Sequence, residues 1–334
     1  MQISFFGVRA LVPVPGPATV RHGGNTACVL VRLSDGGLLV LDCGTGARGL
    51  GLHLLERDFA KGQREATFLL SHPRWDRVQG FPFFRPFYTP SNRFTIYGGL
   101  ATAQALEAVL EGQMAAHYFP LHTFRNMGAA LDLRALAPGA VTNLRPANPA
   151  SPLEGGPASL ISHGFSIGSA HVRALVQAQA QAQATQPDQP SEAASDSAWA
   201  AYRIEDAGRV LVYAAAPVTA NTAARALCSK ADLLVHHAGA MDSDDTEEPG
   251  RDRGQPNDHR IGQTERTGHA DQIDKIVDLA REAAVKNLVL FDYDPDASDT
   301  DVDRMLVRAH RRLETAPGPP LGLRAAAEGA TFDV

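Results

Sequence analysis

Four side chains able to bind metal ions or anions follow one apolar run of the sequence. Residues 66–71 are mostly apolar and β-prone, and His72, Arg74, Asp76 and Arg77 follow them. Imidazole and carboxylate groups ligate divalent cations, whereas a guanidinium stays protonated in proteins and has no lone pair to donate. Guanidinium groups instead bind carboxylates or phosphates through paired hydrogen bonds. The pattern therefore favours an internal ion-pair network or an anion site over a metal centre.

The elements that must position these side chains are short apolar strands and amphipathic helices. The patterning predicts strands over 2–6, 27–33, 38–42, 66–71, 93–97, 160–167, 170–176, 202–205, 209–214, 233–237 and 287–291. It predicts helices over 47–60, 101–111, 271–284 and 299–312. Two strand-rich halves that each end in helices indicate two packed sheets with helices on the outside.

Two segments interrupt this pattern within a chain that is otherwise expected to form one domain over residues 1–334. Residues 177–198 contain seven Ala, six Gln and two Pro and carry no large apolar side chain. They have little surface to bury, so a flexible insertion is predicted there. Residues 242–267 are polar and acidic and are predicted to form a loop.

The segment 69–80 resembles the metal-binding segment of the metallo-β-lactamase superfamily, in which a strand precedes the pattern H-x-H-x-D-H. The segments 23–26 and 41–46 are similar to the first hairpin of that family. Further segments up to about residue 310 follow in the order found in its phosphodiesterase and ribonuclease Z-like branch. The resemblance implies a four-layer αββα sandwich of the α/β class.

Active members of the superfamily hold two metal ions, and the resemblance allows each ligand position to be compared. His72 and Asp76 match ligands of the family, and His269 matches a histidine that supports catalysis in ribonuclease Z-like members. The remaining ligand positions carry other residues, namely Arg74, Arg77, Gln177, Ala216 and Asp292, while His237 stands where relatives carry Asp. His236 and His237 are adjacent on a predicted strand, so their side chains are expected to point to opposite faces.

This comparison predicts a degenerate member that acts as a non-hydrolytic binding, regulatory or scaffolding protein. Its former metal cleft is expected to hold ion pairs of Arg74 and Arg77 with Asp76 and Asp292, or a phosphate or nucleotide ligand. The residues expected to line such a ligand site are His72, Arg74, Asp76, Arg77, His269 and Asp292. The alternative is a metal-dependent hydrolase or phosphodiesterase with a reduced site made of His72, Asp76, Asp292 and His269. No resident cofactor is expected, and at most one weakly bound divalent metal ion.

Composition restricts the partners. The 31 Lys and Arg against 37 Asp and Glu give a formal net charge of −6, without the basic excess of a non-specific nucleic-acid binder. No apolar run is long enough to span a membrane. The first 16 residues lack a basic region and are interrupted by Pro13 and Pro15, so they are not expected to be a signal peptide. Three scattered cysteines fit a reducing compartment, so a cytoplasmic location is expected. A protein partner and a homodimer both remain open.

Overall fold

The computed structural model describes residues 1–59, 65–99, 102–119, 124–136, 141–144, 170–178, 198–215, 222–239 and 269–334. The predicted strand 160–167, the predicted loop 242–267 and most of the predicted insertion, residues 179–197, lie outside these ranges. Within the described residues no helix has both the length and the apolar character needed to cross a membrane.

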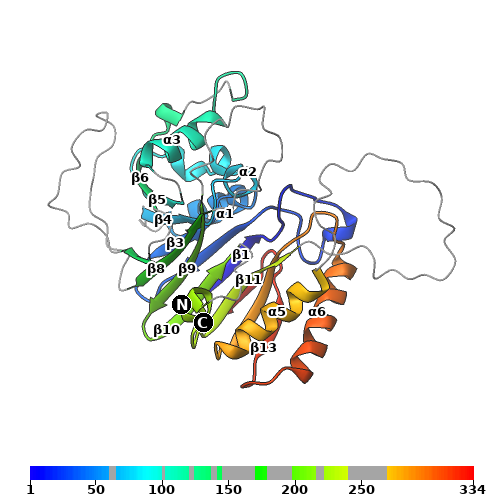
Figure 1. The fold of residues 1–334 in the computed structure, drawn as a ribbon. Coiled ribbons are helices and arrows are strands. Elements are labelled where there is room, and N and C mark those ends of the chain that lie inside the picture. The colour runs from blue at the N-terminus through cyan, green and yellow to red at the C-terminus, as the bar shows by residue number, and fades with distance from the viewer. Residues whose placement is uncertain are drawn as a thin grey trace, which may run out of the picture.

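Two seven-stranded sheets form the centre of the molecule (Figure 1). The first sheet has the order β14 (Thr331–Asp333), β1 (Gln2–Gly7), β2 (Cys28–Arg32), β3 (Leu38–Leu41), β4 (Glu65–Leu70), β5 (Arg93–Gly98) and β6 (Ala130–Ala135). The second has the order β13 (Gly322–Ala325), β12 (Asn287–Tyr293), β11 (Leu233–Gly239), β10 (Arg209–Ala214), β9 (Ala198–Asp206), β8 (His171–Ala178) and β7 (Val141–Leu144). Strand β1 pairs with β14, which brings the two termini side by side.

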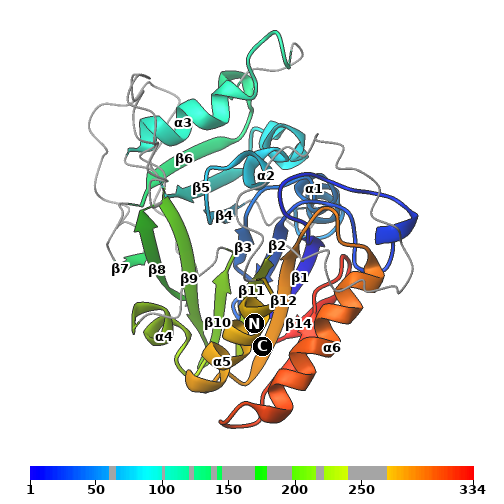
Figure 2. The ribbon, with the colours of Figure 1, turned by 45° about the vertical axis from the view of Figure 1, so that its right-hand side comes forward.

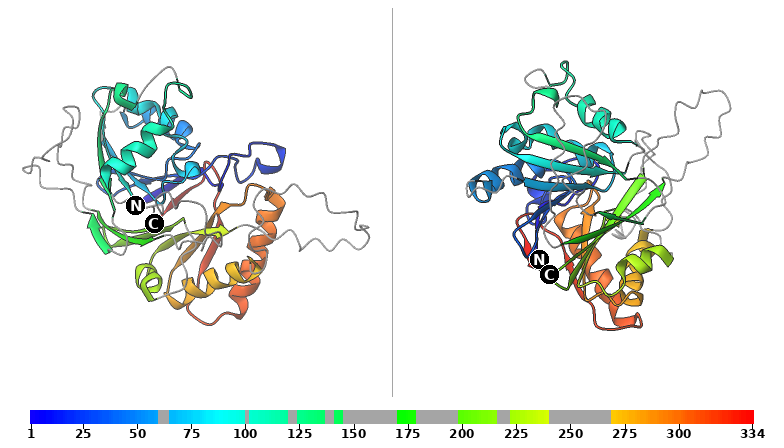
Figure 3. Two further views of the ribbon diagram at one scale, coloured as in Figure 1. Left: turned by 45° about the horizontal axis from the view of Figure 1, so that its top comes forward. Right: turned by 90° about the vertical axis from the view of Figure 1, so that its left-hand side faces the viewer.

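The helices are α1 (Ala47–Glu56), α2 (Trp75–Val78), α3 (Ala103–Gly112), α4 (Thr222–Cys228), α5 (His269–Glu282) and α6 (Asp299–Thr315). Figure 2 shows α4, α5 and α6 beside the second sheet, with α1 and α3 beside the first. In Figure 3 the orange C-terminal helices and the blue to cyan N-terminal helices lie on opposite outer sides of the two sheets. This arrangement confirms the predicted four-layer α/β sandwich.

The layers follow from the alternation of side chains along each strand. On β2, Val29 and Val31 pack in the core between the sheets, whereas Cys28 and Leu30 pack in a second core beneath α1 and α3. Both faces of β2 and β3 are buried in this way, which explains why these two strands are apolar almost throughout rather than alternating.

Several element ends differ from the sequence predictions. Strand β8 extends through Ala178 and β9 begins at Ala198, so both ends of the predicted insertion 177–198 are strand. In the backbone register of these two strands, Gln177 pairs with Trp199 and Ala178 with Ala198. Helix α6 begins where predicted because Ser298 and Asp301 form a reciprocal capping box.

Candidate functional site

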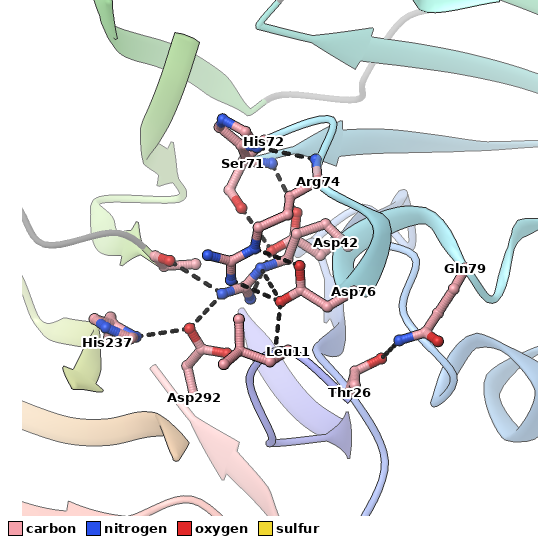
Figure 4. A network of polar contacts seen from close by, with 12 residues as sticks. Leu11, Thr26, Asp42, Ser71, His72, Arg74, Asp76, Gln79, His237 and Asp292 are labelled. Carbon is pink, nitrogen blue, oxygen red and sulfur yellow. Dashed lines mark hydrogen bonds and ion pairs between the residues drawn. The ribbon is translucent and has the colours of Figure 1, made fainter. Parts of the chain in front are cut away.

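The candidate site lies where strands of both sheets end at the same edge of the sandwich. Asp42 follows β3, residues 71–77 follow β4 and enter α2, and Asp292 lies near the end of β12. The backbones of Asp42 and Asp292 have φ values of 59° and 66°, a left-handed conformation that Asp adopts more readily than most residues. These loops bring side chains distant in sequence into one network (Figure 4).

A glycine lets two of these loops approach closely. A Cβ atom on Gly80 would lie 1.8 Å from the carbonyl oxygen of Gly44, so any larger residue there would push the loop after β3 away from α2. The close approach is held by a hydrogen bond of 2.7 Å from the Cys43 N–H to the Arg77 carbonyl. Asp42 and Arg77 are thereby fixed within reach of each other.

Arg77 is the centre of the network, and its side chain is fully buried. Its Nη1 lies 3.3 Å from Asp42 Oδ2, and its Nε lies 3.3 Å from Asp76 Oδ2. Its Nη2 donates to Asp292 Oδ2 and, at 3.2 Å, to the carbonyl oxygen of Ala215. Burial opposes the charged form of Arg77, but the surrounding carboxylates outweigh it and raise the pKa. Arg77 therefore remains a cation inside the protein.

The carboxylates around Arg77 are themselves held by other groups. Asp42 accepts hydrogen bonds from the Ser71 N–H at 2.7 Å, the Ser71 hydroxyl at 2.8 Å and the Tyr213 hydroxyl at 2.7 Å. Burial nevertheless raises the pKa of Asp42. Burial acts the same way on Asp292, but there the charge of Arg77 and a 2.7 Å hydrogen bond from His237 Nδ1 lower the pKa to about 2.

Arg74 forms the rim of the network. Its Nε and Nη2 contact the two carboxylate oxygens of Asp76 at 2.5 and 2.7 Å, a bidentate pair. Its guanidinium carbon lies 5.1 Å from the centre of the Trp199 ring, which also packs at 4.2 Å against His72. The Arg74 side chain is 34% exposed, whereas Asp76 is buried. Arg74 is thus the guanidinium that reaches solvent.

The structure brings together five of the six predicted site residues: His72, Arg74, Asp76, Arg77 and Asp292. The predicted ion pairs of Arg74 and Arg77 with Asp76 and Asp292 are present. The sixth residue, His269, begins α5, but its side chain lies outside the described part of the chain, as do Ala216 and the side chain of Gln177. Of the two adjacent histidines on β11, His236 is buried, and His237 donates a hydrogen bond to Asp292.

Sequence reasoning missed the contributions of Asp42, Ser71, Tyr213 and Trp199. Asp42 carried a usable signal, because a carboxylate directly after the apolar run Leu38–Leu41 and before Gly44 stands at the end of a buried strand. No such signal connects Tyr213 with Asp42, which are 171 positions apart. Trp199 directly follows the alanine- and glutamine-rich stretch 177–198, and nothing in that context indicates a role for it.

The residues present do not fit a metal centre of the superfamily. In the described residues no group of three or more His, Cys, Asp or Glu side chains is arranged to hold a metal ion. The Nδ1 atom of His72 accepts a hydrogen bond of 2.9 Å from the Arg74 N–H. Oxygens of Asp76 and Asp292 bind guanidinium groups instead. A dication placed there would also face the like charge of Arg77 at short range, which is unfavourable in a buried site.

Comparison with known proteins identifies the family of the chain. The family model described as "Beta-lactamase superfamily domain" matches residues 39–293, and the chain belongs to this superfamily. The resemblance inferred from the sequence is therefore confirmed at this level. The comparison with curated proteins found no match.

Solved structures agree in fold. Zn²⁺-bound PqqB from Methylobacterium extorquens matches with a TM-score of 0.55 and 14% identity, with 100% of each chain covered. A diphosphatase of the PhnP family matches at 0.53 and 13%, with 100% of this chain and 97% of that chain covered. The metallo-β-lactamase fold protein YhfI from Bacillus subtilis matches at 0.51 and 16%, with 99% and 98% covered. At these identities the similarity is one of fold.

Proposed function

We propose that this chain is a metal-independent, non-hydrolytic member of the superfamily that acts as a binding, regulatory or scaffolding protein. One observation carries the proposal: the fully buried guanidinium of Arg77 contacts Asp42, Asp76 and Asp292 at the position where the family places metal ligands. Hydrolysis in the superfamily depends on a metal ion that lowers the pKa of a bound water. Here a side-chain cation stands among the carboxylates.

Both guanidinium charges of the network are already paired with carboxylates, which restricts how an external anion is bound. Two guanidiniums face three carboxylates, so Arg77 has no unused charge to offer an anion. Arg74 differs because it is partly exposed and lies over the Trp199 ring. We therefore propose that a phosphate or nucleotide ligand, where the protein binds one, contacts Arg74 and Trp199 at the rim and does not enter the buried network.

The alternative function is a metal-dependent, phosphodiesterase-like hydrolase that uses a reduced site of His72, Asp76, Asp292 and His269. The fold similarity to a diphosphatase of the PhnP family and to Zn²⁺-bound PqqB favours this alternative. It requires the ion pairs of Asp76 and Asp292 with Arg74 and Arg77 to open, because both carboxylates are held by guanidinium groups.

Metal analysis and hydrolysis assays separate the two functions. We expect the purified protein to contain no stoichiometric zinc, manganese or iron, and added Mn²⁺ to produce no hydrolysis of a generic phosphodiester above the rate of the Asp76→Ala variant. Two tightly bound ions per chain, or a Mn²⁺-dependent rate that the Asp76→Ala variant lacks, would establish the hydrolase instead.

Thermal denaturation with phosphate and a panel of nucleotides tests the anion site. A ligand present at one hundred times its Kd stabilises a protein by about 2.7 kcal/mol. We expect a shift in melting temperature that Arg74→Gln abolishes. The matched control is Arg93→Gln, which removes an arginine from a surface ion pair with Glu65 and leaves the shift unchanged. A panel without any shift, or a shift that persists in Arg74→Gln, contradicts the anion site.

We also propose a cytoplasmic location, which the three free and buried cysteines support, because free thiols persist in reducing compartments. A binding or scaffolding role leaves two kinds of partner, another protein or a second copy of this chain. Size-exclusion chromatography with light scattering distinguishes a monomer from a dimer.

A further inference from the structure

A second cavity lies at the end of the sandwich opposite the candidate site. Strands β10, β11, β12 and β13 run parallel to one another, and the candidate site lies at the carboxyl end of β12. The cavity lies at the other end, where Arg209 begins β10, Leu233 begins β11 and Asn287 begins β12. Phe332 of β14 lines it from the first sheet. Val334 also lines it, and Figures 1 and 2 show this terminus away from α2.

The cavity combines an apolar wall with charged side chains. Its volume of about 330 Å³ is near the lower end of the range of ligand pockets, about 300–1,000 Å³. Leu233, Leu288 and Val289 belong to the core between the sheets and also line the cavity. The charged side chains are three cations, Arg209, Lys286 and Arg324, and two carboxylates, Asp232 and Asp333. The lining is therefore positive in a chain whose formal net charge is −6.

Two of the three cations share one carboxylate. The side chain of Asp232 is 9% exposed, and its Oδ1 accepts hydrogen bonds from Lys286 Nζ at 2.7 Å and from Arg209 Nη1 at 3.4 Å. The side chains of Lys286 and Arg209 are themselves more than half exposed. One negative charge thus faces two positive charges, so an excess positive charge remains on this side of the cavity.

Arg324 is the cation that has no carboxylate partner within the described residues. Its guanidinium carbon lies 5.3 Å from the centre of the Phe332 ring, which in turn packs at 5.8 Å against Phe5. A guanidinium over an aromatic ring uses its flat face for that contact and keeps the N–H groups in its plane. Those N–H groups can bind a carboxylate through paired hydrogen bonds.

We propose that this cavity binds a small organic carboxylate, with its carboxylate group on Arg324 and its apolar part against Phe332 and the apolar wall. An inorganic anion has no apolar part to bury there, and a neutral apolar molecule leaves the donors of Arg324 unused. The residues that line the cavity are separate from the Arg77 network. The inference therefore goes beyond the proposed function and does not depend on it.

Saturation-transfer NMR with benzoate as the probe measures binding to the full chain, and a titration gives the Kd. Benzamide keeps the ring without the charge, and acetate keeps the charge without the ring. We expect benzoate to bind in the millimolar range or tighter, and benzamide, acetate and inorganic phosphate to bind at least about tenfold more weakly.

Variants locate the probe. Arg324→Gln is expected to weaken benzoate binding at least about tenfold, because it removes a charge-assisted bidentate contact. Arg324→Lys keeps the charge without the planar fork and should give a smaller loss. Arg324 is exposed, so both variants should keep the native melting temperature. The controls are Arg93→Gln, on a surface ion pair of the first sheet, and Arg74→Gln, at the rim of the candidate site; both should keep the native Kd.

The inference is overturned if benzoate does not bind, or if benzamide, acetate or phosphate binds as tightly as benzoate. Benzoate binding that is unchanged in Arg324→Gln, or lost in Arg74→Gln, puts the ligand at another site and contradicts it as well. Failure of the proposed function has a different signature, namely bound metal or hydrolytic activity in the native protein, and neither of these depends on benzoate.

Discussion

A double-mutant cycle between Arg77 and Asp292 tests whether the buried network is held together by charge compensation. Removing one partner of a buried ion pair costs about 3–5 kcal/mol, because the other charge remains buried without compensation. The Arg77 side chain is fully buried and contacts three carboxylates. We therefore expect Arg77→Met to lower the free energy of unfolding by at least about 3 kcal/mol in the presence of EDTA.

The effect of Asp292→Asn depends on whether Arg77 is present. In the native protein the pKa of Asp292 is lowered from 3.8 to about 2, so its charged form stabilises the fold at pH 7 by about 2 kcal/mol. Because the pKa is lowered, this stabilisation is present above pH 3.8 and disappears as the pH falls towards 2. Asp292→Asn alone should thus cost about 2 kcal/mol at pH 7. In the Arg77→Met background the same substitution removes a repelling charge and should raise stability.

Urea denaturation followed by the fluorescence of the tryptophans measures all four corners of this cycle. The expected signature is a change of sign, because Asp292→Asn destabilises the native protein and stabilises Arg77→Met. Asp232→Asn serves as control, since Asp232 pairs with Lys286 at the opposite end of β11 and should cost the same in both backgrounds. Equal losses from Asp292→Asn in the two backgrounds would refute the reasoning.

Three further predictions concern other buried groups. Burial lowers the pKa of His236 from 6.5 to about 4. On acidification the unfolded state therefore binds the proton before the native state does, and the free energy of unfolding should fall by about 3 kcal/mol as the pH drops from 6.5 to 4. His236→Leu should flatten that part of a pH series of urea melts, and a native protein equally stable at pH 6.5 and 4 contradicts the argument. Tyr213→Phe removes the hydroxyl that donates to Asp42 and should cost about 1–3 kcal/mol in thermal unfolding; an unchanged melting temperature would show that Asp42 does not need it. Burial raises the pKa of all three thiols, so a thiol reagent at pH 8 should label Cys28, Cys43 and Cys228 only after unfolding, and fast labelling of the native protein would contradict their burial.

The part of the fold that was predictable from the sequence is the part governed by local patterning. Strand β3 is a continuous apolar run and β4 is apolar apart from Glu65 and Thr67, so their buried positions follow directly. The ends of β8 and β9 were not predictable, because Gln177 and Ala198 belong to a polar, alanine-rich stretch. They are in strand conformation because the backbones of β8 and β9 pair with each other, which amino-acid composition does not encode.

The candidate site divides in the same way. The residues of the segment after β4 were predictable because they lie close together in sequence and their types limit the chemistry: His72 and Asp76 could ligate a metal, and Arg77 could not. The residues that complete the network come from other elements. Tyr213 and Asp292 reach it only because β10 and β12 end at the same edge as β3. Long-range convergence of this kind needs the topology before it can be inferred.

The position of Arg77 explains how several buried carboxylates are accommodated in one folded site. Two aspartates in the left-handed conformation, Asp42 after β3 and Asp292 near the end of β12, come from opposite sheets and both contact Arg77. Like charges repel each other in a buried site. A neutral residue at position 77 would leave that repulsion uncompensated, so an arginine there is favoured by the same electrostatics that favours a metal ion. The difference lies in the chemistry that follows, because a guanidinium at this depth holds its proton and offers no open coordination position to a water molecule. Under the proposed non-hydrolytic function, Arg77 supplies positive charge to the buried carboxylates without a means of activating water.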